Sequence, residues 1–258
     1  MILEEILAHK RVEVARRAHR RSPRDIAAAA EAAPAPRDFA GALGGPGLAV
    51  IAEIKGASPS AGTIKTAYAP VEIARAYQAG GAAALSVLTD AKYFQGSWDT
   101  LRVVARASTL PVLCKEFIVD PYQIDEARAA GAAAVLLIAA VLEGRTLRAH
   151  LAHSRRRGLA ALVEVHTPDE VALALDAGAE VIGINNRDLR TLGVDLGTTA
   201  LLRPLIPAGV IVVSESGFER RDQVEAVARL GVDAILVGTS LMGSADPAAK
   251  LKELRGIS

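Results

Sequence analysis

The chain has 258 residues, of which 51% are hydrophobic, and its formal net charge is +1. No basic run alternates with aromatic residues, and no stretch reaches the roughly 20 apolar residues of a membrane helix, so neither a nucleic-acid partner nor a membrane span is expected. The single cysteine, Cys114, excludes an internal disulfide and a cysteine metal cluster, and we expect it to be buried. The charged start lacks the apolar core of a secretory signal. This composition predicts a cytoplasmic globular protein.

The first 45 residues predict helices and linkers. Residues 2–19 are amphipathic at helical spacing, with Ile2, Ile6, Val12 and Ala15 on one side, and residues 22–33 predict a second, shorter helix. Such a segment could cap one end of the protein or contribute to a substrate site, and the sequence favours neither.

From residue 48 onward the chain alternates short apolar runs with helical patterns. Glycines at the ends of four helical patterns, Gly80, Gly131, Gly178 and Gly231, are typical C-caps. The runs are continuously apolar, as in a parallel sheet covered by helices on both faces. Strands are therefore predicted near residues 48–55, 82–89, 111–117, 133–140, 160–166, 181–186, 210–215 and 234–238.

Eight strand–helix units in about 250 residues are the signature of a closed (β/α)₈ TIM barrel. We expect one domain, 1–258, made of an extra N-terminal helical segment at 1–45 and a barrel at 46–258. A doubly wound open sheet is the alternative. No glycine fingerprint of a dinucleotide-binding fold follows the first strand, which weakens it.

Charged and polar residues gather where the strands end. Glu53 and Lys55 are two residues apart in the first strand, so their side chains point to the same face. The opposite strand ends carry mostly Ala, Gly, Val and Pro. A strand-end charge can simply meet water, and Glu53 with Lys55 could merely knit adjacent strands. Because barrel enzymes carry their chemistry at the carboxyl ends of the strands, the asymmetry nevertheless predicts an active site. The strand-end residues are Glu53, Lys55, Lys115, Glu164, His166, Asn185, Asn186, Arg187, Ser214, Glu215, Ser216, Gly217, Gly238, Thr239 and Ser240.

The last two strand ends predict a phosphate site. The stretches "SESG" and "VGTS" look like glycine turns that open helices, and barrels commonly bind phosphate after strands seven and eight. "GASPSAG", after the first strand, could close this site from the side. Either turn alone would be an ordinary loop, but together they indicate a phosphorylated small-molecule substrate.

The histidines do not predict a metal site, because they lack zinc spacing. His150 and His153 are expected on a solvated helix face. His166 shares a face with Glu164 but is expected to cap the turn into "TPDE".

With these residues placed, the chain resembles the indole-3-glycerol phosphate synthase family. The likeness runs from "ILEEILAHKR" nearly to the end, and "VEVHT" with "GINNRDL" is its most specific part. Other matching stretches are "VIAEIK", "SVLTD", "KEFIVDPYQIDEAR", "VSESG" and "ILVGTSLM". The resemblance implies ring closure of 1-(2-carboxyphenylamino)-1-deoxyribulose 5-phosphate with loss of carbon dioxide and water, without a cofactor or metal.

The resemblance also implies roles for single residues. Lys115 would protonate the carbonyl oxygen, Glu164 and Lys55 would serve the later dehydration, and the division of steps between the two lysines stays open. Lys55 would also hold anionic groups of the substrate, and Glu53 would fix the lysines and bond substrate hydroxyls. Further positions that match the family's site are Asn185, Arg187, Glu215 and Ser216, those of its phosphate grip are Ser58, Gly217, Gly238 and Thr239, and those that would sandwich the aromatic ring, or else belong to the core, are Phe94, Phe117 and Leu136.

Two positions depart from the family pattern. Family members usually carry basic residues where this chain has Gly56 and Ala61, beside the expected phosphate site. We therefore expect weaker substrate binding or a more mobile first loop, with the chemistry intact.

Other functions remain open from the sequence. Another phosphate-binding barrel would be an isomerase with a cysteine or aspartate acid–base pair, or an aldolase-type lyase that uses a lysine Schiff base. A non-catalytic relative could keep the barrel as a binding scaffold, although it would not need Glu53, Lys55, Lys115 and Glu164. A monomer is compatible with the sequence, and a pathway complex is not excluded.

Overall fold

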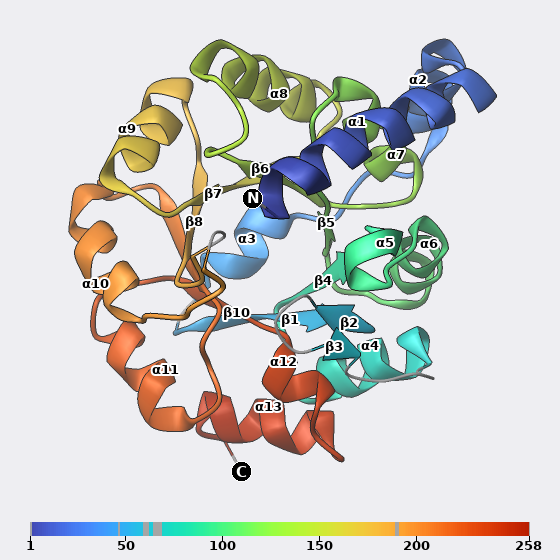
Figure 1. Ribbon diagram of the computed structural model, residues 1–258. Helices are drawn as coiled ribbons and strands as arrows, with labels where there is room; N and C mark the ends of the chain where they lie inside the picture. Colours follow the sequence, from blue (N-terminus) through green and yellow to red (C-terminus); the bar gives the residue numbers. More distant parts are fainter. Residues whose placement is uncertain (1, 46, 59–61, 64–68, 189–190, 258) are drawn as a thin grey trace.

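The computed structural model describes residues 2–45, 47–58, 62–63, 69–188 and 191–257. Figure 1 shows a ring of helices around a barrel, which closes in the order β1-β10-β9-β8-β7-β6-β5-β4 with all neighbours parallel. The barrel strands are β1 (Ala49–Ile54), β4 (Ala84–Leu88), β5 (Val112–Lys115), β6 (Ala134–Ile138), β7 (Ala160–Val165), β8 (Val181–Asn185), β9 (Ile211–Glu215) and β10 (Ala234–Val237). The predicted TIM barrel is confirmed, and closure rules out the open sheet.

Helices follow the strands as the sequence predicts, with small elements added in the loops. The main ones are α4 (Pro70–Ala79), α6 (Trp98–Ala107), α7 (Pro121–Ala129), α8 (Gly144–Arg156), α9 (Pro168–Ala177), α10 (Gly197–Leu202), α11 (Arg221–Ala228) and α13 (Pro247–Arg255). The additions are a hairpin after β1, made of β2 (Ala57–Ser58) and β3 (Gly62–Thr63), and the short helices α5 (Ala91–Phe94), η1 (Arg203–Leu205) and α12 (Thr239–Met242).

The interior of the barrel is packed in layers from alternate strands. Ile51, Leu113, Leu162 and Val213, on β1, β5, β7 and β9, belong to one buried apolar cluster. Branched and aliphatic side chains fill small barrels in this way, so the barrel is a solid core and not a channel. The cluster forms an apolar floor on which the strand-end residues stand.

The N-terminal segment serves both ends of the barrel through different helices. It comprises α1 (Ile2–Arg20), α2 (Pro23–Ala32) and α3 (Phe39–Leu43). Phe39 and Leu43 join the interior cluster beside the first residues of several strands, so α3 closes the amino end. In Figure 1, α1 begins near the middle of the ring and runs outward toward α7, against which it packs.

The predicted buried side of α1 is wrong in part. Ile6 is buried, but Val12 is 52% exposed and Ala15 is exposed, while Lys10 and Val14 are buried. The side chain of Ile2 lies outside the described residues. The buried face is rotated because Lys10 meets interior carboxylates, a contact that no apolar periodicity can reveal.

The predicted solvated face of α8 is also corrected. His150 is buried, with its Nδ1 2.8 Å from the Thr146 carbonyl oxygen, and His153 Nε2 lies 2.7 Å from Asp125 Oδ1 on α7. The helix packs this face against α7. Cys114 is buried as expected. Within the described part of the chain, no helix is long and apolar enough to cross a membrane.

Candidate active site

The uppermost layer inside the barrel is charged. Glu53, Lys115, Glu164 and Glu215 stand two residues beyond the apolar floor on β1, β5, β7 and β9, so strand alternation points them inward as well. They line a cavity of about 570 Å³ at the carboxyl ends of the strands. This charged layer contains three of the predicted catalytic residues, Glu53, Lys115 and Glu164, together with Glu215, which was predicted to bind the substrate.

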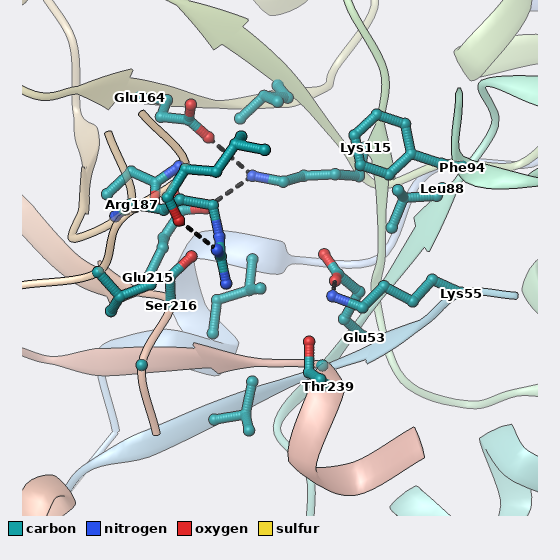
Figure 2. Close-up of a pocket in the computed structure, with 18 of the residues that line it drawn as sticks. Glu53, Lys55, Leu88, Phe94, Lys115, Glu164, Arg187, Glu215, Ser216 and Thr239 are labelled. Atoms are coloured by element: carbon teal, nitrogen blue, oxygen red, sulfur yellow. Dashed lines mark hydrogen bonds and ion pairs between the residues drawn. The ribbon is translucent and has the colours of Figure 1, made fainter. Parts of the chain in front are cut away.

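Lys115 is held between two carboxylates. Its Nζ lies 2.8 Å from Glu164 Oε2 and 2.6 Å from Glu215 Oε2 (Figure 2). Burial alone would lower the pKa of Lys115, but the charges of Glu164 and Glu215 raise it above its ordinary value. In the free site Lys115 is therefore an ammonium group.

The two carboxylates that hold Lys115 have different environments. Burial raises the pKa of Glu215 to about 7, against the pull of Lys115 and with the nearby charge of Glu164 adding to the rise. Burial acts on Glu164 in the same direction, but Lys115 and His166 outweigh it and lower the pKa of Glu164. Glu164 is the ionised member of the pair, and Glu215 can exchange a proton near neutral pH.

His166 supports Glu164 and does not cap α9, contrary to the sequence-based expectation. Its Nδ1 lies 3.2 Å from Glu170 Oε2 and its Nε2 lies 3.5 Å from Glu164 Oε1. The N-cap of α9 is Thr167, whose hydroxyl accepts a hydrogen bond from the Glu170 amide. Burial opposes protonation of His166, but Glu170 and Glu164 raise its pKa.

Lys55 and Glu53 form a second ion pair in the cavity. Lys55 Nζ lies 2.8 Å from Glu53 Oε1, and Figure 2 shows the pair apart from Lys115 with Thr239 below it. The backbone of Gly238 passes so close that a Cβ there would contact Glu53 and would lie 2.9 Å from Lys55 Nζ. Glycine at 238 therefore leaves room for the pair.

The loop after β8 completes the polar rim. Asn185 Oδ1 accepts a hydrogen bond from the Arg187 amide at 3.0 Å, and the Arg187 guanidinium donates to the Leu192 carbonyl at 2.7 Å. Asn185 also donates a hydrogen bond that helps to lower the pKa of Glu164. Ser216, with φ of 70°, turns the chain directly after β9 into the cavity lining.

Apolar side chains form one wall of the cavity. The rings of Phe94 and Phe117 have centroids 5.9 Å apart, and Leu136 lines the same cavity. Leu3 and Ile6 of α1 also line it. The N-terminal segment therefore contributes to the site as well as closing the opposite end of the barrel.

The expected phosphate residues are only partly described. Gly217, Gly238 and Thr239 line the cavity, and α12 begins at Thr239 as "VGTS" predicts. "SESG" does not open a helix, because α11 begins only at Arg221. The amides of Glu219 and Arg220, just before α11, donate hydrogen bonds to Gln223 Oε1. The side chain of Ser58 and all of Ala61 lie outside the described residues, whereas Gly56 is described and buried.

Sequence reasoning assigned no supporting role to two residues behind the site: Asn186, which it placed only among the strand-end residues, and Gly183, which it did not single out. Asn186 Nδ2 donates to the Glu215 carbonyl at 3.0 Å and to the Ser216 carbonyl at 3.1 Å, which fixes the end of β9. Gly183 leaves the space that the Glu215 carboxylate occupies. The only sequence signal was the stretch "GINN", which contains both residues.

The arrangement suits acid–base chemistry on an anionic molecule. It offers an ammonium between two carboxylates, a second lysine–carboxylate pair, helix-end amides and an apolar wall. Among the described residues, no group of three His, Cys, Asp or Glu side chains could hold a metal ion.

One protein family and its named members match this chain over nearly its whole length. The sequence family described as indole-3-glycerol phosphate synthase matches residues 3–254. Indole-3-glycerol phosphate synthase 2 of Streptomyces coelicolor is 49% identical over 255 residues, which cover 99% of this chain and 99% of that protein. Indole-3-glycerol phosphate synthase of Roseiflexus sp. (strain RS-1) is 48% identical over 264 residues, covering 99% and 98%. A solved 3-hexulose-6-phosphate synthase shares the fold alone, with a TM-score of 0.65 and 19% identity over 82% of this chain and 100% of that one.

Proposed function

The chain belongs to the indole-3-glycerol phosphate synthase family, and we propose that the charged layer performs this family's reaction, a decarboxylating ring closure in tryptophan biosynthesis. The substrate is 1-(2-carboxyphenylamino)-1-deoxyribulose 5-phosphate. The single observation that carries the proposed site is Lys115, held as an ammonium between Glu164 and Glu215 beside an apolar wall.

Lys115 is the proposed acid for ring closure. The aromatic carbon that bears the carboxyl group bonds to the carbonyl carbon, the carbonyl oxygen takes a proton from Lys115, and carbon dioxide leaves with restoration of the aromatic ring. An ammonium with a raised pKa is a weak acid, and catalysis favours an acid with a pKa near the working pH. We therefore infer that bound substrate draws Lys115 away from one carboxylate before the proton moves.

Glu164 and Lys55 are the proposed pair for the dehydration. The hydroxyl group leaves as water with a proton from an ammonium, and a carboxylate removes a ring proton to form the indole double bond. Glu164 suits the base because Lys115 and His166 keep it ionised. Glu53 holds Lys55 at 2.8 Å, which is the support expected for a lysine that must keep a fixed direction.

The remaining residues are proposed to bind the substrate. Phe94, Phe117 and Leu136 would enclose the aromatic ring, and the amides after β9 and β10 would hold the phosphate. Asn185 and Ser216 would contact the reacting groups, while Arg187 and Glu215 would bind substrate oxygens. Ser58 remains a prediction from the sequence, as do the single-domain division, a monomeric state and a cytoplasmic location.

Turnover of the named substrate tests this proposal. The purified chain should release indole-3-glycerol phosphate, followed by indole fluorescence, and carbon dioxide in equal amounts. Binding of the substrate without either product would favour the non-catalytic scaffold. Trapping of a covalent adduct by borohydride would instead favour a Schiff-base lyase.

A further inference from the structure

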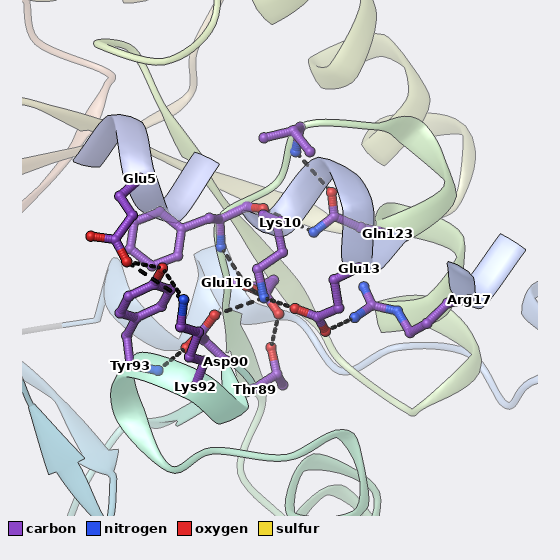
Figure 3. Close-up of polar contacts among 12 residues, drawn as sticks. Glu5, Lys10, Glu13, Arg17, Thr89, Asp90, Lys92, Tyr93, Glu116 and Gln123 are labelled. Atoms are coloured by element: carbon purple, nitrogen blue, oxygen red, sulfur yellow. Dashed lines mark hydrogen bonds and ion pairs between the residues drawn. The ribbon is translucent and has the colours of Figure 1, made fainter. Parts of the chain in front are cut away.

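Helix α1 sends one lysine into the interior of the protein. The Lys10 side chain is 0% exposed, and its Nζ lies 2.8 Å from Asp90 Oδ2, 3.0 Å from Glu116 Oε1 and 2.8 Å from Glu13 Oε2 (Figure 3). Burial would lower the pKa of Lys10, but Glu116, Asp90 and Glu13 together raise it. Lys10 is therefore a buried ammonium that faces three carboxylates.

The first interior partner, Asp90, begins the segment that carries part of the apolar wall. Asp90 follows β4 and is the N-cap of α5, where it accepts a hydrogen bond from the Tyr93 amide at 2.7 Å. Phe94, which follows Tyr93 and is the last residue of α5, lines the cavity. A movement of Asp90 would therefore move α5 and the ring of Phe94.

The second interior partner, Glu116, stands between two site residues in the chain. It directly follows Lys115, and its Oε1 accepts a hydrogen bond from the Phe117 amide at 2.8 Å. Its Oε2 accepts a hydrogen bond from the Thr89 hydroxyl at 2.8 Å, which ties the end of β5 to the end of β4. Lys10 thus contacts Asp90 at the end of β4 and Glu116 at the end of β5. Phe94 follows the first of these residues in the chain, and Lys115 and Phe117 flank the second.

We propose that Lys10 is a positioning residue for the reaction, which from outside the barrel fixes the ends of β4 and β5 through Asp90 and Glu116. The inference rests on the proposed function, because it assigns Lys10 no contact with the substrate. It gives α1 a role in aligning Lys115 and the aromatic wall, in addition to the contribution of Leu3 and Ile6 to the cavity lining.

Removal of the ammonium would disturb this geometry. Asp90 and Glu116 are both buried, so without Lys10 two carboxylates would face each other in the interior. Burial already raises the pKa of Glu116, and Lys10 opposes that rise. One carboxylate would have to take up a proton or turn toward water, and either change loosens its hydrogen bond to a site amide.

A purely structural role for Lys10, as one of several anchors of α1, makes a different prediction. Arg17 is a second cation on the same helix, and its NH2 lies 3.1 Å from Glu126 Oε2 of α7 and its guanidinium 5.2 Å from the Trp98 ring centroid. Within the described part of the chain, Arg17 shares the partner Glu13 with Lys10 but contacts neither Asp90 nor Glu116. Arg17→Met is therefore the matched control for Lys10→Met.

Steady-state kinetics on 1-(2-carboxyphenylamino)-1-deoxyribulose 5-phosphate, well below both melting temperatures, separates the two roles. Lys10→Met should lower kcat/KM roughly 10- to 100-fold, with a fall in kcat as well as a rise in KM, because the reacting groups are misplaced. Arg17→Met should stay within about threefold of the wild type. The proposal would be overturned if Lys10→Met and Arg17→Met lowered the melting temperature equally and also lowered kcat/KM equally. If Lys10→Met does not fold, Lys10→Arg takes its place. Its larger fork must displace one carboxylate and lower kcat/KM, and wild-type kinetics for it would overturn the proposal.

Amide hydrogen exchange provides a readout that does not depend on turnover. The amides of Tyr93 and Phe117 should exchange faster in the Lys10 variant than in the wild type, and should be unchanged in Arg17→Met. Unchanged exchange in the Lys10 variant would overturn the proposal. If the wild type lacks turnover but the two amides still respond, the proposed function fails while the structural coupling holds.

Discussion

The ammonium of Lys115 lies 2.6 Å from the carboxylate of Glu215, although β5 and β9 stand on opposite sides of the barrel. Glu53 on β1 and Glu164 on β7 are opposed in the same way. Alternate strands supply one layer, so four side chains that are far apart in sequence stand at the same level of the mouth, and Lys115 meets two of the others, Glu164 and Glu215. The layer holds three carboxylates and one lysine. Burial is the main cause of the raised pKa of Glu215, and the charges of Glu164 and Glu53 add to the rise against the pull of Lys115.

Glu215→Gln should change how stability depends on pH. The folded pKa of Glu215, about 7, lies above its unfolded value, so its contribution to stability is fully present at low pH and is lost as pH rises through about 7. Relative to Glu215→Gln, the wild type should therefore lose on the order of 2 kcal/mol of unfolding free energy between about pH 5 and pH 8. Denaturant unfolding at several pH values measures this difference.

The exposed Glu219, four residues along the chain, provides the control for this series. The unfolding free energy of Glu219→Gln should follow that of the wild type across the same pH range. Parallel curves for Glu215→Gln as well would mean that Lys115 keeps Glu215 fully ionised at neutral pH.

Gly183→Ala should damage the site from below. A Cβ at this position would collide with the Glu215 carboxylate and lie 3.1 Å from Leu162 Cδ1, so Glu215 must turn away from Lys115. We expect a loss of about 1–3 kcal/mol of unfolding free energy, together with a fall in kcat. Gly45→Ala, where a Cβ meets nothing within 4 Å, is the control. An active and stable Gly183→Ala enzyme would show that Glu215 does not need its observed position.

Phe94→Leu should weaken substrate binding more than catalysis. If the ring of Phe94 packs on the aromatic ring of the substrate, its loss removes about 0.5–1.5 kcal/mol, which raises KM about 2- to 12-fold and leaves kcat nearly unchanged. Tyr93→Phe, which removes the hydroxyl that contacts Glu5 on α1, is the control on the same short helix. A fall in kcat at constant KM would assign Phe94 to the core of the protein instead.

Restored positive charge on the first loop should improve binding. The family resemblance predicts Ala61 beside the phosphate. For Ala61→Lys we therefore expect KM to fall about 2- to 5-fold at low salt, with the gain shrinking as salt rises. Ala61→Gln, similar in length but uncharged, is the control. Gly56→Arg is measured separately because Gly56 is buried and its replacement must reach solvent. An unchanged KM for both variants would show that the missing positive charge at positions 56 and 61 does not affect substrate binding.

The sequence predicted what depends on local pattern and on chain order. Apolar runs and glycine C-caps recur along the chain, so all eight strands could be located, and closure then brings Lys115, Glu164 and Glu215 together. Lys10 could not be predicted in this way. A lysine on an amphipathic helix normally meets water. Its burial here depends on the distant carboxylates of Asp90 and Glu116, which add to the local carboxylate of Glu13.

The same limit explains the errors at other positions. Val12 fits an apolar stripe but lies outside the buried face that Lys10 determines, and His150 is buried because α8 turns that face toward α7. The space that Gly183 leaves for Glu215 is visible only after β8 and β9 have been placed side by side.

The most direct test of the role of Lys115 compares the wild type with Lys115→Ala in turnover of 1-(2-carboxyphenylamino)-1-deoxyribulose 5-phosphate, followed by indole fluorescence. We expect product from the wild type and a loss of kcat of roughly 10²-fold or more in a folded variant that still binds the substrate. A Lys115→Ala enzyme with nearly wild-type kcat would contradict the role of Lys115 as the acid and would leave the reaction to other groups of the charged layer.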